Sequence, residues 1–301
     1  MSDRTLRLSR DELWRLLELV DPVELVAARL GGAACGDEAG RLSAAGASGG
    51  DHVVFEDRDT AVRCLLPASA LRGLRTASVV ALAARALLFP SLVTVAVLGS
   101  DPATQLQLAL IARYVPGVSF VAVWPDDGQP LDERVLDLLD RTDISLLTAG
   151  DAGEAMFGAS LLVGVGLDRL PARRPAPGAV LVNATGRDLP ANLENTADGI
   201  YVDDLGLLGD NRHRRFVRVH TDRNDRDSEP HWRAEGWHRN QGRSQVQGDL
   251  GQVLTGACPG RTTIDEVLLV ELLGLRDLDV TLACRFHRAA LQDGAGAWLS
   301  E

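Results

Sequence analysis

The stretch between residues 93 and 204 constrains the fold more than any other part of the chain. Short apolar runs alternate there with amphipathic segments. VTVAVLG, VSFVAVW, DISLLTA and AVLVNATG are typical of buried strands, whereas PATQLQLALIARYV and LDERVLDLLDRT are typical of helices. Strands that alternate with helices at this spacing favour parallel pairing with crossover helices on the sheet faces. The sequence therefore predicts an α/β protein with a doubly wound parallel sheet.

The segments on either side of this block predict further elements. Ser9 precedes the helical pattern RDELWRLLELV as a capping residue, and PVELVAARL begins with proline at its first helical position. Residues 31–51 are rich in Gly, Ala and Ser and predict a loop, whereas HVVFEDRDTAVRCLLP predicts two short strands joined by a turn. Near the other end, TIDEVLLVELLG and DLDVTLACRFHRAALQDG both predict helices.

Composition excludes several classes of function. The 301 residues carry a net charge of −11, which argues against general binding of nucleic acid or of an anionic membrane. All 31 basic residues are arginines, so no lysine Schiff base, lysine general base or P-loop lysine exists. The four cysteines form no C-x-x-C pair, and the polar start is unlike a signal peptide. We expect a cytoplasmic protein with reduced thiols and no membrane segment.

The turn after the first buried strand, VAVLGSDPATQ, resembles a phosphate-binding turn but departs from it. A dinucleotide site favours G-x-G-x-x-G, and this chain has Gly99, Ser100 and Asp101 at the start of that pattern. Asp101 followed by proline is typical of a helix cap. Its carboxylate would repel a bound phosphate by about 1 to 4 kcal/mol at ~4 Å. Asp126, which closes the next strand, is placed where an acid would bind the ribose and favour NAD over NADP.

The order of four segments resembles the ornithine cyclodeaminase/μ-crystallin family. LRTASVVALAARAL resembles the helix that enters the nucleotide domain of that family, and GAVLVNATGRDLPANLE resembles its N-A-x-G-x-D-x-P segment. GDLGQVLTGACPGR and the two opening helices also fit the family. The similarity covers most of the chain apart from residues 31–51 and 211–243.

The resemblance implies a fold, a cofactor and partners. It predicts a Rossmann-type doubly wound parallel sheet, at 76–263, inserted in a smaller α+β domain for substrate binding and dimerisation. Both chain ends, 1–75 and 264–301, would form that smaller domain. Family members bind NAD or NADP and interconvert amino acids with imines or keto acids. We accordingly expect a small amino-acid-like substrate, and a homodimer or a partner enzyme.

The resemblance also assigns site residues. Arg75 matches the arginine that binds a substrate carboxylate or a cofactor phosphate, and a guanidinium suits either through paired hydrogen bonds. Asp188 matches the carboxylate that acts as acid or base at the substrate nitrogen. Gly99 matches the first glycine of the phosphate turn. Each has a simpler alternative: Arg75 could lie on a solvated helix face, and Asp188 could stabilise a turn before a proline.

Two further differences from the family leave two functions possible for this chain. The family's catalytic lysine has no counterpart, and Arg63 cannot lose its proton near neutral pH. The short, loop-like segment 31–51 stands where the family has strands of the substrate pocket. The chain could therefore be an enzyme with a remodelled pocket, or a catalytically degenerate member that acts as a binding or assembly subunit.

Residues 211–243 interrupt the strand–helix pattern. They contain nine arginines, four histidines and two tryptophans. The wide histidine spacing disfavours a metal site, so no metal is expected. The interleaved arginine and tryptophan could suggest contact with nucleic acid, but the acidic whole favours a loop that faces the chain itself or a partner, or a disordered insertion.

Overall fold

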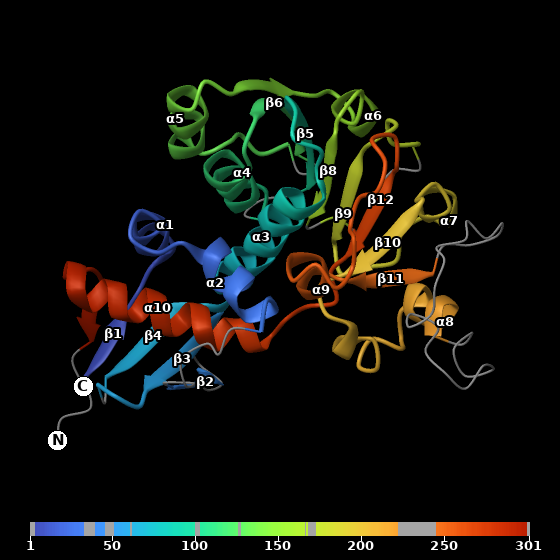
Figure 1. Ribbon diagram of the computed structural model, residues 1–301. Helices are drawn as coiled ribbons and strands as arrows, with labels where there is room; N and C mark the ends of the chain where they lie inside the picture. The colour runs from blue at the N-terminus through green and yellow to red at the C-terminus, as the bar shows by residue number, and fades with distance from the viewer. Residues whose placement is uncertain are drawn as a thin grey trace. The chain divides into compact units, whose positions relative to one another are not determined.

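The computed structural model describes residues 4–32, 40–45, 51–60, 62–99, 103–125, 128–165, 167, 173–221 and 245–299. The chain divides into two compact units, one formed by residues 1–79 and 275–301 and the other by residues 80–274. Figure 1 shows the elements of both units along the chain. An inserted α/β unit and a unit built from both chain ends are the architecture that the sequence predicts.

The unit formed by residues 80–274 contains a parallel sheet in the order β11-β10-β12-β9-β8-β5-β6-β7 (Figure 1). The sequences of its strands are runs of apolar residues, because the strands of a parallel sheet are covered on both faces. The strands are β5 (Val93–Gly99), β6 (Val118–Pro125), β7 (Ser145–Thr148), β8 (Leu161–Val165), β9 (Val180–Ala184), β10 (Gly199–Val202), β11 (Val246–Asp249) and β12 (Leu268–Glu271).

The helices of this unit connect the strands. The long helix α3 (Ala68–Leu87) leads into the sheet and crosses the division between the two units. The others are α4 (Ala103–Tyr114), α5 (Glu133–Arg141), α6 (Ala152–Ala155), α7 (Ala191–Glu194), α8 (Arg215–Thr221) and α9 (Leu250–Leu254), with a 3₁₀ turn at Leu205–Leu207.

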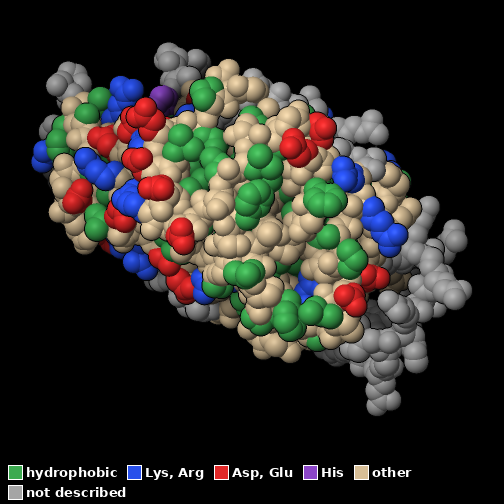
Figure 2. Space-filling model, turned by 90° about the horizontal axis from the view of Figure 1, so that it is seen from above, with side chains coloured by type: hydrophobic (Ala, Val, Ile, Leu, Met, Phe, Trp, Pro, Cys, Tyr) green, Lys and Arg blue, Asp and Glu red, His purple; other side chains and the backbone are tan. Residues whose placement is uncertain are grey.

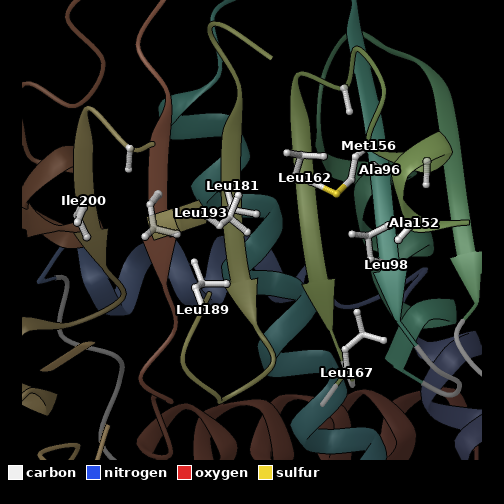
Figure 3. Close-up of a cluster of buried hydrophobic side chains, with 14 of the residues drawn as sticks. Ala96, Leu98, Ala152, Met156, Leu162, Leu167, Leu181, Leu189, Leu193 and Ile200 are labelled. Carbon is white, nitrogen blue, oxygen red and sulfur yellow. The ribbon is translucent and has the colours of Figure 1, made fainter. Parts of the chain in front are cut away.

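One face of the parallel sheet packs against α6, α7 and α8 in a single hydrophobic cluster. Figure 3 shows Ala96 and Leu98 of β5 in the same layer as Leu162 of β8 and Leu181 of β9. Phe216 and Val217 of α8 belong to this cluster and are fully buried. Residues 211–221 are therefore part of the folded unit, although the sequence analysis assigns them to an insertion. The rest of that predicted insertion, 222–243, lies outside the described residues.

The unit formed by the chain ends contains a five-stranded sheet in the order β13-β1-β4-β3-β2. Helix α10 contacts β2 and β3 of this sheet as well as α1 and α2. Ser9 caps α1 with a reciprocal capping box, as the sequence predicts. The elements are β1 (Thr5–Arg7), α1 (Arg10–Leu16), α2 (Pro22–Leu30), β2 (Gly40–Ala44), β3 (His52–Asp57), β4 (Arg63–Pro67), α10 (Asp277–Asp293) and β13 (Ala297–Leu299).

Two sequence predictions of secondary structure are wrong. The predicted loop at 31–51 contains β2. The sequence of this segment has only a weak strand pattern, but its backbone pairs antiparallel with β3 at the edge of the sheet. The predicted helix TIDEVLLVELLG contains β12 instead. A short apolar run is compatible with a buried helix or with a central strand. Here the run lies between β9 and β10 and pairs with both of them, so it forms a strand. Because β12 belongs to the parallel sheet, the return to the first unit falls at Leu275 rather than at residue 264.

Figure 2 shows one face of the molecule, on which arginine and acidic side chains are intermixed. The exposed hydrophobic side chains on this face form small separate groups. Among the residues that the structure describes, no helix is both long enough and apolar enough to cross a bilayer.

Candidate active site

The point where the chain reverses its direction across the parallel sheet lies between β5 and β8. From β5 the chain proceeds to β6 and β7 on one side, and it then returns to build β8 and β9 on the other side. Gly99 at the end of β5 pairs with Pro125 of β6 and with Val165 of β8. In open α/β sheets the loops diverge at such a switch point and leave a ligand crevice beyond the carboxyl ends of the strands.

Gly99 has no room for a side chain. A Cβ atom there would lie 2.1 Å from the carbonyl oxygen of Val165 and 3.1 Å from the hydroxyl of Thr104 on α4. The glycine thus lets β5, β8 and the start of α4 approach one another closely at the switch point. The predicted cofactor-binding residues Ser100, Asp101 and Asp126 lie outside the described residues.

A cavity of about 540 Å³ lies at the carboxyl ends of β6 and β7. Trp124 and Pro125 end β6, and Thr148 ends β7, so the cavity lies at the same edge of the sheet as Gly99, the last residue of β5. Its described lining comprises residues 124–125, 128–131, Leu136, Leu146 and 148–150.

Asp188, the predicted catalytic carboxylate, caps a helix that is distant in sequence. Its two carboxylate oxygens accept hydrogen bonds from the backbone N–H groups of Arg215 (2.8 Å) and Phe216 (3.1 Å), at the start of α8. Its Oδ1 also lies 3.8 Å from Nε of Arg214, and 32% of its side chain is exposed. Asp188 is therefore held in place while part of it stays accessible to solvent.

A buried polar network supports the loop that carries Asp188. The carboxylate of Glu271, at the end of β12, is fully buried and accepts a hydrogen bond from Arg214 Nη2 at 2.6 Å. Asn183 on β9 donates to the same carboxylate at 2.9 and 3.0 Å. Arg214 and Asn183 each also donate to the carbonyl of Arg187 at 2.8 Å. Burial raises the pKa of Glu271 to about 7, although the charge and hydrogen bond of Arg214 and the hydrogen bond of Asn183 oppose the rise.

The sequence analysis missed this network. A polar Asn183 inside the apolar run AVLVNA and an acidic Glu271 at the end of EVLLVE are the available signals, since a charged residue on a buried strand needs a partner. The partner itself could not be found from the pattern, because Arg214 lies among many arginines in the segment 211–243.

Asp203 is a second buried acid at this edge of the sheet. It follows β10 and is 1% exposed. Its carboxylate accepts hydrogen bonds from the backbone N–H groups of Leu273 and Gly274, both at 2.9 Å. It thereby anchors the segment that follows β12. Burial raises the pKa of Asp203 to about 6, although these backbone hydrogen bonds oppose the rise.

This shift predicts a pH dependence of stability. The native state holds the Asp203 proton more tightly than the unfolded chain does. The contribution of Asp203 to the free energy of unfolding is therefore largest at low pH. That contribution falls between pH 3.8 and about 6, by up to about 3 kcal/mol. Because Asp203 contributes a negative slope of stability against pH in this range, denaturant titrations of Asp203→Asn are expected to give a more positive slope than those of wild type. Asp210→Asn, at an exposed position, is expected to keep the wild-type slope, and an unchanged slope in Asp203→Asn would contradict the assignment.

Arg75, the other predicted catalytic residue, lies in the unit formed by the chain ends. Its Nη1 donates to Oδ2 of Asp279 on α10 at 2.6 Å, and only 10% of its side chain is exposed. Arg75 is therefore not on a solvated helix face. Burial raises the pKa of Asp279, and the neighbouring charge of Arg75 opposes that rise. Arg75 and Asp188 belong to different units, and each is placed here within its own unit.

The sequence matches no family model and no curated protein. Solved structures do match over the full chain. A structure described as CmnK is 22% identical, with 99% of each chain covered and a TM-score of 0.72. The Δ1-pyrroline-2-carboxylate reductase of Thermococcus litoralis, in complex with NADH and L-proline, is 14% identical, with 97% of this chain and 99% of that chain covered and a TM-score of 0.68. A probable ornithine cyclodeaminase from Bordetella pertussis is 16% identical over 97% of this chain and 99% of that one, with a TM-score of 0.62.

The chain shares its fold with these solved structures, among them the reductase and the probable ornithine cyclodeaminase. The fold predicted from the resemblance is thus confirmed. Two of the segments that carry the resemblance to the ornithine cyclodeaminase family lie at one edge of the parallel sheet. GAVLVNATGRDLPANLE spans β9, the Asp188 loop and α7, whereas GDLGQVL contains Asp249, which caps α9 at the end of β11.

Within this ornithine cyclodeaminase-type fold, the described residues contain no cluster of histidine, cysteine and acidic side chains able to hold a metal ion. The histidines and tryptophans that the sequence pattern places in the segment 222–243, namely His231, Trp232, Trp237 and His238, lie outside those residues.

Proposed function

We propose that this chain is a nicotinamide-dinucleotide-dependent enzyme that acts on a small amino acid or its imine. The observation that carries the proposal is the switch point between β5 and β8, where Gly99 permits a close approach of backbone that a Cβ atom would block. The similarity in fold to a reductase solved with NADH and L-proline supports the same class of cofactor and substrate.

The described residues fit a dinucleotide in two places. α4 is a helix of 12 residues that begins four residues after Gly99, and its first turn would attract the pyrophosphate. The cavity at the ends of β6 and β7 would hold the adenosine half, because the ribose of a dinucleotide lies beside the end of the second strand of such a unit. When bound, the nicotinamide would accept or return a hydride.

The protein's own residues would bind the substrate and move a proton. Asp188 would stabilise the charged substrate nitrogen or exchange a proton with it, because its carboxylate is both held by α8 and partly exposed. Arg75, in the other unit, would bind a substrate carboxylate or a cofactor phosphate, the role that the resemblance assigns to it. A guanidinium has five N–H donors, so Arg75 can bind a carboxylate while it keeps its hydrogen bond to Asp279.

A second candidate is a catalytically degenerate member that serves as a binding or assembly subunit. The contacts of the two predicted catalytic residues favour it, since Asp188 caps α8 and Arg75 pairs with Asp279. The absence of lysine favours it as well. In this case neither NADH nor NADPH would bind.

Titration with both nucleotides tests the proposal. Nucleotide fluorescence and the melting temperature are followed while purified protein is titrated with NADH or NADPH to millimolar concentration. A Kd of about 100 μM would stabilise the native state by roughly 1.4 kcal/mol at 1 mM ligand, which corresponds to a rise of about 2–4 °C in melting temperature. No change with either nucleotide would favour the degenerate subunit.

The Asp101→Gly variant tests whether the Asp101 carboxylate opposes dinucleotide binding. Removing the carboxylate from the phosphate turn is expected to tighten dinucleotide binding by about tenfold or more, since like-charge repulsion at ~4 Å costs about 1 to 4 kcal/mol. Asp210→Gly makes the same change of charge at an exposed residue of another loop and is expected to leave Kd unchanged. If neither wild type nor Asp101→Gly binds a dinucleotide, the enzyme proposal is refuted.

A further inference from the structure

A second cavity, of about 340 Å³, lies on the face of the parallel sheet beside α6. Its apolar walls are formed by Phe120 and Ala122 of β6, Leu147 of β7, and Phe157 after α6. α6 is a single turn of four residues, and Phe120 and Leu147 next to it are only partly buried. Core side chains of the sheet therefore remain open to a ligand in this cavity, which we call the Phe157 cavity.

The Phe157 cavity is separate from the cavity proposed for the adenosine half of the dinucleotide. Leu147 of β7 pairs with Ala122 of β6, and both line the Phe157 cavity. The neighbours of Leu147 along the strand, Leu146 and Thr148, line the other cavity. Because successive side chains of a strand point to opposite faces of the sheet, β7 presents one face to each cavity. The two cavities share no lining residue.

An arginine beside the Phe157 cavity is available to bind an anion. The guanidinium carbon of Arg173 lies 6.0 Å from the centre of the Phe157 ring, and Phe157 is 80% exposed. Within the part of the chain that the structure describes, Arg173 forms no ion pair. Gly153 leaves room for this arrangement, since a Cβ atom there would lie 2.7 Å from Nη1 of Arg173. A guanidinium stacked on a ring keeps its N–H groups available for paired hydrogen bonds to a carboxylate.

The acidic side chains of the α6 turn are directed to the backbone. Oδ1 of Asp151 accepts a hydrogen bond from the N–H of Glu154 at 2.8 Å. Glu154 belongs to the cavity wall, and its Oε2 accepts a hydrogen bond from the N–H of Gly150 at 2.7 Å. Both carboxylates thereby stabilise the start of α6. Neither one forms an ion pair with Arg173, so the charge of the guanidinium is left for a ligand.

We propose that the Phe157 cavity is a binding site for a small aromatic carboxylate, separate from the proposed dinucleotide site. The ring of the ligand would lie against Phe120 and Leu147, and its carboxylate would accept paired hydrogen bonds from Arg173. A volume of about 340 Å³ is at the lower end of the range for ligand sites, so it suits a single ring with a short side chain. The inference does not depend on the proposed function, because the two sites share no lining residue.

Titration of the full chain with 3-phenylpropanoate, followed by ligand-observed NMR, tests the site. We expect saturable binding with a Kd of about 1 mM or tighter. 3-Phenylpropanol keeps the ring without the charge, and propanoate keeps the charge without the ring, so each is expected to bind at least about tenfold more weakly. Binding of 3-phenylpropanoate is expected to weaken as salt is raised, since Arg173 is exposed. Absence of saturable binding, or equal binding of the three compounds, would overturn the inference.

Variants of the two exposed residues locate the binding site. Arg173→Gln is expected to raise the Kd for 3-phenylpropanoate at least about tenfold, and Phe157→Ser to raise it about threefold or more. Arg174→Gln removes the same charge from the next exposed residue and is expected to keep the wild-type Kd. Melting temperatures check that each variant is folded. If folded Arg173→Gln binds 3-phenylpropanoate as tightly as wild type, or if Arg174→Gln weakens binding equally, the ligand does not occupy the Phe157 cavity and the inference fails.

Discussion

Replacement of Arg214 by methionine is expected to lower the free energy of unfolding by about 3–5 kcal/mol, because it leaves the carboxylate of Glu271 buried without its cationic partner. Arg214 also donates to the carbonyls of Arg187 and Leu272, so the loop before Asp188 loses a support at the same time. Denaturant titration at pH 8 measures the effect, since burial raises the pKa of Glu271 and an alkaline pH favours its ionised form.

Two further variants distinguish the effect of losing the Arg214 charge from the effect of losing its packing. Arg134→Met breaks an ion pair that is 41% and 35% exposed, and it is expected to cost less than about 1 kcal/mol. The double variant Arg214→Met/Glu271→Gln removes the uncompensated charge and is expected to recover about 1–3 kcal/mol relative to Arg214→Met alone. A single variant as stable as wild type, or a double variant no more stable than the single one, would contradict the role of Glu271 as a buried anion.

Replacement of Gly99 by alanine is expected to destabilise the protein by about 3 kcal/mol or more and to abolish dinucleotide binding. The added Cβ would lie 2.1 Å from the carbonyl oxygen of Val165, which is backbone and cannot turn aside as a flexible side chain can. β8 would have to move away from β5, although the two strands pair over five residues at the centre of the sheet. Overpacking, with the side-chain and backbone shifts that it forces, typically costs about 1–3 kcal/mol and occasionally more, and the backbone contact at Gly99 places this substitution at the upper end.

Gly209→Ala is the matched control for this prediction. Gly209 is exposed, and a Cβ there would meet no atom within 4 Å. Its replacement is expected to change stability by less than about 0.5 kcal/mol and to leave the Kd for NADH unchanged. Denaturant titration and NADH titration of both variants check the two expectations. A Gly99→Ala protein of wild-type stability would show that β5 and β8 are not packed as described.

The strands and helices were predictable where local pattern and tertiary position agree. β5 and β9 are apolar runs of the length of a buried strand, and Ser9 offers the oxygen that caps α1. Local pattern failed at β12, where VLLVE suits a helix equally well, and at β2, whose Gly- and Ala-rich surroundings are typical of a loop. Both strands are specified by the neighbours with which they pair.

The residues of the candidate site likewise fall into those that the sequence indicates and those that only the fold brings together. Gly99 and, through the resemblance, the motif around Asp188 both point to the carboxyl edge of the parallel sheet, whereas their cofactor-binding and catalytic roles, like that of Arg75, remain predictions. Glu271, Asn183 and Arg214 could not be grouped from sequence. Arg214 and Glu271 are separated by 57 residues, and Asn183 and Glu271 by 88.

Local sequence was enough to specify the class of fold, because alternation of apolar strands with amphipathic helices is a property that each segment carries alone. It also established that no lysine chemistry is available. The packed fold was needed to place β12 between β9 and β10, and so to bury Glu271 beside Arg214 and beneath the Asp188 loop. A buried charge is tolerated only beside a partner, and which partner lies beside it depends on strand order, which no single segment encodes.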